Sequence, residues 1–155
     1  MFKTLKELCE TALAIPNSEP AQIVCPDGRQ IILCDAGSAA WYPESLPTVS
    51  IHTPFCKYIP VQVLVRLRHP EVLRLAFQDV PDASLEPHLT QAVEFMSRHP
   101  KVLVHCRMGK SRSASIVVAF LMRQYNLSYE DALATVQAAR PIVNINPGFS
   151  QQLKS

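Results

Sequence analysis

The chain has 155 residues, of which 48% are hydrophobic and 18% are charged, and its formal net charge is +2. This length and apolar content suit one compact domain and exclude an intrinsically disordered chain. The nearly neutral balance gives no general electrostatic footprint for nucleic acid or for an anionic membrane surface, so we expect neither as a partner.

The cysteines and histidines argue against two further classes of protein. The five cysteines stand far apart without a C-x-x-C pair, which disfavours a disulfide framework and indicates a reducing compartment, cytoplasmic with nuclear as the alternative. We expect no signal peptide and no membrane-spanning helix, because no apolar run is long enough. The histidine spacing fits no metal ligand set, so neither a metal nor another cofactor is expected.

In chain order, the first elements are a helix, a linker and a hairpin. Apolar residues at helical spacing predict an amphipathic helix over residues 2–15, and the prolines after it predict a linker up to residue 20. Two apolar runs around Pro26-Asp27-Gly28 predict a β-hairpin. Residues 35–60 are rich in turn formers, and we expect them to be irregular. Residues 1–20 are therefore treated as a helix and linker that precede a main domain over residues 21–155.

From residue 61 onward, strands and helices are expected to alternate, which indicates an α/β domain. The expected strands are residues 61–65, 72–77 and 102–104; the expected helices are residues 85–98 with Ser84 as the cap, the buried run 114–122, a helix capped by Ser128 and ended by Pro141, and residues 147–153.

The segment over residues 105–115 lies where an expected strand ends and an expected helix begins. Such a turn directs backbone N–H groups into one concave space, and the helix N-terminus adds positive potential there. Arg112 enters at the first turn of the helix, and its planar guanidinium can hold two phosphate oxygens at once. Cys106 opens the loop, so its sulfur faces the same space, where the field favours the nucleophilic thiolate. The segment therefore predicts a loop that binds a phosphate group and activates its attacker.

Two other interpretations of this loop are weaker. Gly109-Lys110-Ser111 resembles the end of a Walker A loop, but that motif requires a glycine where Val104 stands inside the strand. A structural cysteine with an arginine nearby by chance does not explain why the strand, the His before the Cys, the mid-loop Gly and the helix all agree.

His105-Cys106-x-x-Gly109-x-Ser111-Arg112-Ser113 resembles the signature of the dual-specificity phosphatases, which are part of the cysteine-based tyrosine phosphatase superfamily. The resemblance covers residues 61–153, because residues 77–82 resemble the acid loop of that family, and Arg140-Pro141 and residues 146–149 resemble its C-terminal half. It implies a central, mostly parallel sheet of about five strands flanked by helices, with the phosphate-binding loop between a strand and a helix. Residues 21–155 would then be the catalytic domain.

The resemblance also implies roles for single residues. Cys106 would form a thiophosphate intermediate, His105 would orient the loop and favour the thiolate, and Ser113 would support release of the phosphate. Asn146 would brace the loop, and a plain packing or capping role is an equal alternative for it. The residues implied to hold the phosphate are Arg107, Met108, Gly109, Lys110, Ser111 and Arg112.

The leaving oxygen of a phosphoester needs a proton as the bond breaks, and a carboxylic acid on a neighbouring loop can supply it. Asp79 and Asp82 are both candidates, and an ordinary turn or capping role is the alternative for each. The resemblance favours Asp79, because it follows the β-rich run directly, whereas Asp82 is expected near the start of the next helix.

The short chain leaves little length for the walls of a deep phosphotyrosine slot. We therefore expect a shallow cleft that admits phosphoserine and phosphothreonine as well as phosphotyrosine in proteins. Arg107 and Lys110 flank the loop with positive charge, as in some lipid phosphatases of the superfamily, so a phosphoinositide or an RNA 5′-triphosphate is the alternative substrate. A non-catalytic phospho-binding module is the third interpretation, which the presence of both Cys106 and Arg112 disfavours.

The apolar stripe of the helix over residues 2–15 must be buried somewhere. It can pack on its own domain, or it can be exchanged with a second copy of the chain across the proline-bearing linker. The second arrangement is slightly favoured, so the expected partners are a phosphorylated protein and a second copy in a homodimer.

Overall fold

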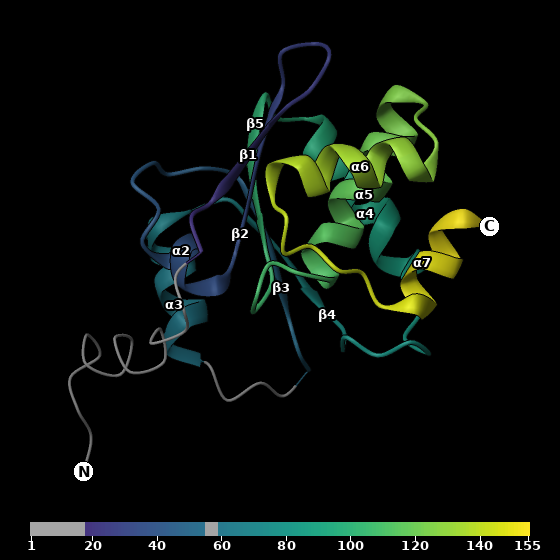
Figure 1. The fold of residues 1–155 in the computed structure, drawn as a ribbon. Coiled ribbons are helices and arrows are strands. Elements are labelled where there is room, and N and C mark those ends of the chain that lie inside the picture. The colour runs from purple at the N-terminus through teal and green to yellow at the C-terminus, as the bar shows by residue number, and fades with distance from the viewer. Residues whose placement is uncertain (1–17, 55–58) are drawn as a thin grey trace.

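The computed structural model describes residues 18–54 and 59–155. Within these residues one sheet lies between two groups of helices (Figure 1). The elements are, in chain order, β1 (Ala21–Val24), β2 (Gln30–Cys34), α2 (Ala36–Ala40), β3 (Thr48–His52), α3 (Ile59–Arg68), β4 (Val72–Ala76), α4 (Glu86–Ser97), β5 (Lys101–His105), α5 (Arg112–Tyr125), α6 (Tyr129–Ala139) and α7 (Pro147–Lys154).

The sheet has the strand order β1-β2-β5-β3-β4. Only the edge strand β1 is antiparallel to its neighbour, so the expected mostly parallel sheet of about five strands is confirmed. The register pairs His105, at the end of the central strand β5, with Cys34 of β2 and Ser50 of β3. The carboxyl ends of three parallel strands therefore meet at one edge, which is where open α/β sheets bind their ligands.

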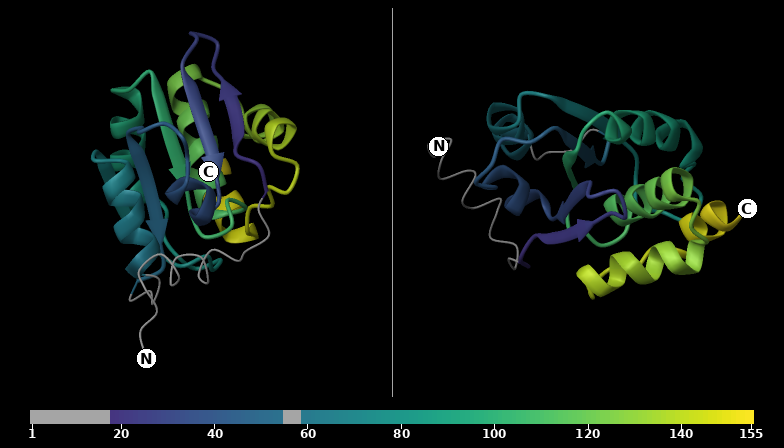
Figure 2. Two further views of the ribbon diagram at one scale, coloured as in Figure 1. Left: turned by 90° about the vertical axis from the view of Figure 1, so that its left-hand side faces the viewer. Right: turned by 90° about the horizontal axis from the view of Figure 1, so that it is seen from above.

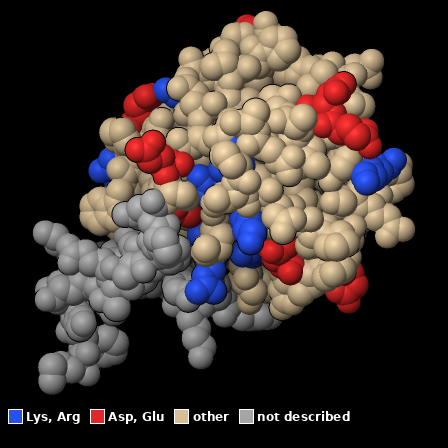
Figure 3. Space-filling view, in the orientation of Figure 1, with Lys and Arg blue, Asp and Glu red and all other residues tan. Residues whose placement is uncertain are grey.

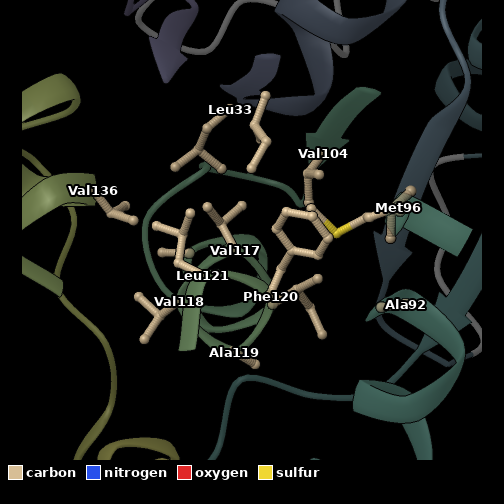
Figure 4. Packing of buried hydrophobic residues seen from close by; sticks show 14 of the residues in the cluster. Leu33, Ala92, Met96, Val104, Val117, Val118, Ala119, Phe120, Leu121 and Val136 are labelled. Carbon is tan, nitrogen blue, oxygen red and sulfur yellow. The ribbon is translucent and has the colours of Figure 1, made fainter. Parts of the chain in front are cut away.

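The helices cover both faces of the sheet. Helices α2 and α3 lie on one face, and α4, α5, α6 and α7 lie on the other (Figure 2). All residues from Arg112 to Leu121 of α5 are buried, because this helix lies between the sheet and its neighbours α4 and α6. Phe120 of α5 points toward Val104 of β5 and Met96 of α4 in the core (Figure 4). The central strand and the helix that follows it thus form a rigid support for the loop that joins them.

The expected hairpin is confirmed, with β1 and β2 paired antiparallel around a turn in which Gly28 has a φ of +88°. In the C-terminal half, the expected strands at β4 and β5 and the buried helix α5 are also confirmed. Ser128 caps α6 as expected, since its side chain accepts a hydrogen bond from Asp131 N, and α7 is the expected last helix. The predicted helix over residues 2–15 lies outside the described residues.

Two expectations for the segment between β2 and β4 are wrong. Residues 35–60 are not irregular, since they contain α2, β3 and the start of α3. Residues 61–65 belong to helix α3 and not to a strand. The valine-rich run suggests a strand there, but Val65 is buried while Val63 and Leu67 are exposed. Packing against the sheet and α2 therefore overrides the local β pattern.

Ser84 does not cap the expected helix over residues 85–98. The helix α4 begins at Glu86, and the residue at its N-cap, Leu85, makes no side-chain capping bond. The Leu85 N–H instead donates to Gln152 Oε1 of α7 at 2.8 Å. A distant side chain thus replaces the local cap, and α7 is tied to the segment before α4.

Candidate active site

The loop over residues 106–111 joins the end of β5 to the start of α5 at the ligand-binding edge of the sheet. The sequence-predicted phosphate-binding residues are therefore together in one turn. Gly109 has a φ of +64°, and a Cβ atom there would lie 2.6 Å from the Cys34 carbonyl oxygen. Only glycine lets the middle of the loop approach β2 this closely without strain.

Cys106 lies at the base of this loop and is only 2% exposed. The Gly109 N–H donates to Cys106 Sγ at 3.2 Å, and the Ser113 Oγ lies 3.1 Å from the same sulfur. Donors directed at a sulfur stabilise its thiolate form, and the N-terminal end of α5 contributes the same sign of potential. The structure thus brings Cys106 and Ser113 together.

His105 lies behind the loop and is buried. Burial lowers the pKa of His105 to about 4, so its imidazole is neutral near pH 7. Its Nδ1 lies 3.2 Å from the Cys106 carbonyl oxygen, which can only accept, so Nδ1 carries the hydrogen. His105 therefore contacts Cys106 through a backbone hydrogen bond and supplies no positive charge to the sulfur.

Arg112 is the first residue of α5 and is 7% exposed. Its Nη1 donates to Thr53 Oγ1 at 3.0 Å and to the Phe77 carbonyl oxygen at 3.2 Å. These two bonds fix the guanidinium plane from the side of β3 and β4. Among the described residues no hydrogen bond uses Nε or Nη2, so these two donors remain for an anion.

Asp79 lies in the bend after β4, at the edge of the same site. Its Oδ1 accepts from Ser111 Oγ at 2.7 Å and from Asn146 Nδ2 at 2.8 Å. Asp82 lies in the following turn and is exposed. Of the two candidate acids, Asp79 is the one that is bonded to the phosphate-binding loop within the described part of the chain.

Asn146 makes three hydrogen bonds that connect α7, the loop and Asp79. Its Oδ1 caps α7 by accepting from Phe149 N at 2.9 Å, and its own N–H donates to Ser111 Oγ at 3.1 Å. The Ser111 hydroxyl was implied to bind phosphate, but these contacts use it to hold Asp79 and Asn146. Asn146 therefore both caps a helix and braces the loop.

No role was predicted for Gly148, although it packs against the acid loop that carries Asp79. A Cβ atom at Gly148 would lie 1.9 Å from the Pro81 carbonyl oxygen, so α7 and the acid loop are in direct backbone contact. Arg140 was likewise noted only as part of a motif, yet its side chain contacts the outer side of the phosphate-binding loop. A glycine in the first turn of an expected helix and an arginine directly before a proline are the sequence signals that could have indicated both residues.

The rim of the site carries exposed side chains of Arg107, Met108 and Lys110. Figure 3 shows Lys and Arg atoms gathered in the lower centre of this face, where Figure 1 places the loop between β5 and α5. No group of three or more His, Cys, Asp or Glu residues that could hold a metal ion is found within residues 18–54 and 59–155. None of the described helices is long and apolar enough to cross a bilayer.

Comparison with known proteins gives matches over most of the chain. Residues 50–155 match the family model described as dual specificity phosphatase, catalytic domain. The chain is 46% identical over 81 residues to rat protein phosphatase Slingshot homolog 3 and 38% identical over 86 residues to mouse dual specificity protein phosphatase 15. These matches cover 50% and 53% of the chain but only 12% and 37% of the two relatives.

The fold is similar to that of human DUSP28, with a TM-score of 0.67 and 27% sequence identity. This likeness covers 91% of the chain and 95% of the DUSP28 chain, so it includes the strands and helices that surround Cys106.

Proposed function

The chain belongs to the dual specificity phosphatase catalytic-domain family, and we propose that it hydrolyses phosphotyrosine, phosphoserine and phosphothreonine in proteins through a thiophosphate intermediate on Cys106. One observation carries this proposal. The Cys106 sulfur lies at the base of the loop, 3.2 Å from the Gly109 nitrogen, and Arg112 begins the adjoining helix with Nε and Nη2 unused by any hydrogen bond among the described residues.

In the first step, the Cys106 thiolate attacks the phosphorus, the P–S bond forms and the P–O bond to the leaving group breaks. The loop N–H groups and the Arg112 guanidinium bind the non-bridging oxygens and stabilise the charge that develops on them. The leaving oxygen takes the proton of the Asp79 carboxyl group. Because Asp79 Oδ1 already accepts two hydrogen bonds, this proton lies on Oδ2.

In the second step, water attacks the phosphorus of the thiophosphate and the P–S bond breaks. The Asp79 carboxylate now accepts a proton from that water and is restored to its acid form. Sulfur leaves as a thiolate, and the Ser113 hydroxyl, 3.1 Å from Sγ, donates a hydrogen bond to it as its negative charge returns. Orthophosphate is the second product, and atoms and charge balance without a metal ion.

Support for a protein substrate comes from the relatives, which are named as protein phosphatases. The basic rim residues Arg107 and Lys110 are compatible with acidic sequences around a phosphorylated residue. No contact of the described residues favours a phosphoinositide or an RNA 5′-end over a phosphoprotein.

A panel of substrates with one purified sample tests the proposal. We expect hydrolysis of phosphotyrosine and phosphothreonine peptides that persists in EDTA, is inhibited by vanadate and disappears in Cys106→Ser. Faster hydrolysis of phosphoinositide or RNA 5′-triphosphate would overturn the substrate assignment. Metal-dependent turnover by Cys106→Ser would overturn the cysteine mechanism.

We also propose a homodimer that exchanges the helix predicted over residues 2–15. The proposed location is a reducing compartment, the cytoplasm with the nucleus as the alternative, because the chemistry needs a reduced Cys106. The dimer proposal is supported by the apolar stripe and the proline-bearing linker alone. Light scattering on the full chain tests it, since a monomer at high concentration would contradict the exchange.

A further inference from the structure

We propose that Arg140, Ser18 and Asp35 form a positioning clamp that holds the phosphate-binding loop in its anion-binding shape, so that the segment before β1 is a working part of the site. This inference rests on the proposed phosphate-binding role of the loop. Its evidence is a set of hydrogen bonds on the outer side of the loop, away from Cys106.

Arg140 contacts two successive carbonyl groups of the loop. It follows the last residue of α6, is 3% exposed, and donates from Nε to the Gly109 carbonyl at 2.8 Å and from Nη2 to the Met108 carbonyl at 3.1 Å. A peptide unit is planar, and its C=O and N–H groups point in opposite directions. A carbonyl held on the outer side therefore directs the next N–H group to the inner side.

This geometry links Arg140 to the nucleophile. The carbonyl of Met108 shares a peptide plane with the Gly109 N–H, which is the group that donates to Cys106 Sγ at 3.2 Å. The carbonyl of Gly109 likewise shares its plane with the Lys110 N–H. Arg140 thus sets the orientation of two donors that an oxyanion in the loop requires.

The flanking carbonyls are held in the same way, so four successive peptide planes are fixed from outside. The Arg107 carbonyl accepts from Ala36 N at 3.2 Å, and the Lys110 carbonyl accepts from Asn144 N at 2.9 Å. These two bonds come from backbone groups, whereas the two central bonds depend on the Arg140 side chain. The central part of the loop is therefore the part that a side-chain substitution can release.

The far side of the guanidinium is held by the segment before β1. Arg140 Nη1 donates to the Glu19 carbonyl at 3.0 Å, and Nη2 donates to Ser18 Oγ at 2.7 Å. The Ser18 hydroxyl in turn donates to Asp35 Oδ2 at 3.2 Å, and Asp35 is 2% exposed. Asp35 Oδ1 accepts from Ser38 N at 2.7 Å at the start of α2, which fixes the carboxylate.

The Ser18 hydroxyl therefore stands between a buried cation and a buried anion. It accepts a hydrogen bond from Arg140 and donates one to Asp35, so the position of the Asp35 carboxylate influences where the Arg140 guanidinium lies. Buried charges are costly unless they are paired and hydrogen-bonded. Removing this hydroxyl leaves Asp35 Oδ2 without this donor and leaves Arg140 Nη2 with one acceptor fewer.

The test is the affinity of the full chain for inorganic tungstate, a stable tetrahedral oxyanion, measured by calorimetry. We expect Ser18→Ala to weaken tungstate binding about tenfold, the lower end of the effect of one hydrogen bond to a charged partner. Arg140→Lys should weaken it more, and the double variant should lose less than the product of the two single losses, because both act on one network. Glu19→Ala is the matched control, since it keeps the carbonyl that Arg140 uses, and its affinity should equal that of the unmodified chain.

Thermal unfolding of each variant is measured beside its affinity, because a merely structural role would lower stability and leave tungstate binding unchanged. Unchanged binding by folded Ser18→Ala overturns the clamp, and so does full additivity of the two substitutions. Absence of tungstate binding by the unmodified chain overturns it as well. If the chain binds tungstate but hydrolyses no phosphopeptide, the proposed function fails while the clamp is still decided by the variants.

Discussion

Asp79→Asn is the substitution that separates acid catalysis from structure most cleanly. Asparagine has the same shape, and its Oδ1 can accept the two hydrogen bonds that Ser111 and Asn146 donate to the carboxylate. What is lost is the proton on the second oxygen. We therefore expect a folded protein whose first chemical step has no general acid.

The two effects differ enough in size to be told apart. Replacing the carboxyl group by an amide of the same shape keeps both hydrogen bonds and changes only their strength, which should cost at most about 1 kcal/mol of stability at this exposed position. Losing a general acid should slow the reaction by about 10²–10⁴-fold, which corresponds to roughly 3–5 kcal/mol of activation free energy. A loss of activity in this range therefore exceeds any loss that partial unfolding would produce.

The assay is a series of aryl phosphates whose leaving groups differ in basicity. The loss in kcat/KM of Asp79→Asn should be large for the most basic leaving group and should nearly vanish for an electron-poor phenol that departs without a proton. Asp82→Asn is the matched control, with little loss across the series. An equal loss for all leaving groups would refute the acid role of Asp79. Leaving-group dependence in Asp82→Asn would instead assign the acid role to Asp82.

Four further outcomes are expected. Cys106→Ser should abolish turnover but still bind tungstate, which steady-state kinetics and calorimetry check. Arg112→Lys should lower kcat/KM about 100-fold in the same kinetic assay, because a point charge cannot replace the bidentate guanidinium. Gly148→Ala should lower both the melting temperature and kcat/KM, because its Cβ would lie 1.9 Å from the Pro81 carbonyl oxygen. Either α7 or the acid loop must then move, at a cost of about 1–3 kcal/mol of stability. A variant with unchanged stability would contradict this close approach. Burial lowers the pKa of His105 from its ordinary 6.5 to about 4, so the neutral imidazole contributes about 3 kcal/mol to the free energy of unfolding. This contribution should be fully present above pH 6.5 and should be lost as the pH falls toward 4. Chemical unfolding at several pH values measures this, and His105→Asn should show a shallower decline over the same range.

The parts of the site that are local in sequence could be predicted, because one strand, one turn and one helix carry them. The loop from Cys106 to Arg112 needs no distant residue to be recognised, and the buried helix α5 follows from its long apolar run. The strand β3 was missed because it lies inside the sheet and is buried yet contains Thr48 and Ser50. The Thr48 hydroxyl is satisfied locally by the Leu46 carbonyl at 2.8 Å, which a pattern of hydropathy cannot indicate.

Contacts between distant residues account for what could not be predicted. The bond from Arg140 to Ser18 joins residues 122 positions apart, and the bond from Asn146 to Asp79 joins residues 67 positions apart. Neither pair has a spacing that marks it, since each depends on how α6 and α7 pack after the sheet has formed. Asp79 was favoured over Asp82 by family resemblance, and the hydrogen bond to Ser111 is a physical reason that only the three-dimensional arrangement supplies.

The support of one short loop by both ends of the described chain has a consequence for how the protein is made. Residues 18–19 reach the loop through Arg140, and α7 reaches it through Asn146, so the two central carbonyls are held only once Arg140 is in place, and Asp79 is held by Asn146 only once α7 is in place. Synthesis proceeds from the N-terminus, and Cys106 leaves the ribosome before Arg140 and Asn146 do. A nascent chain would thus expose an ordinary thiol, and its reactivity would appear late, together with the completed fold.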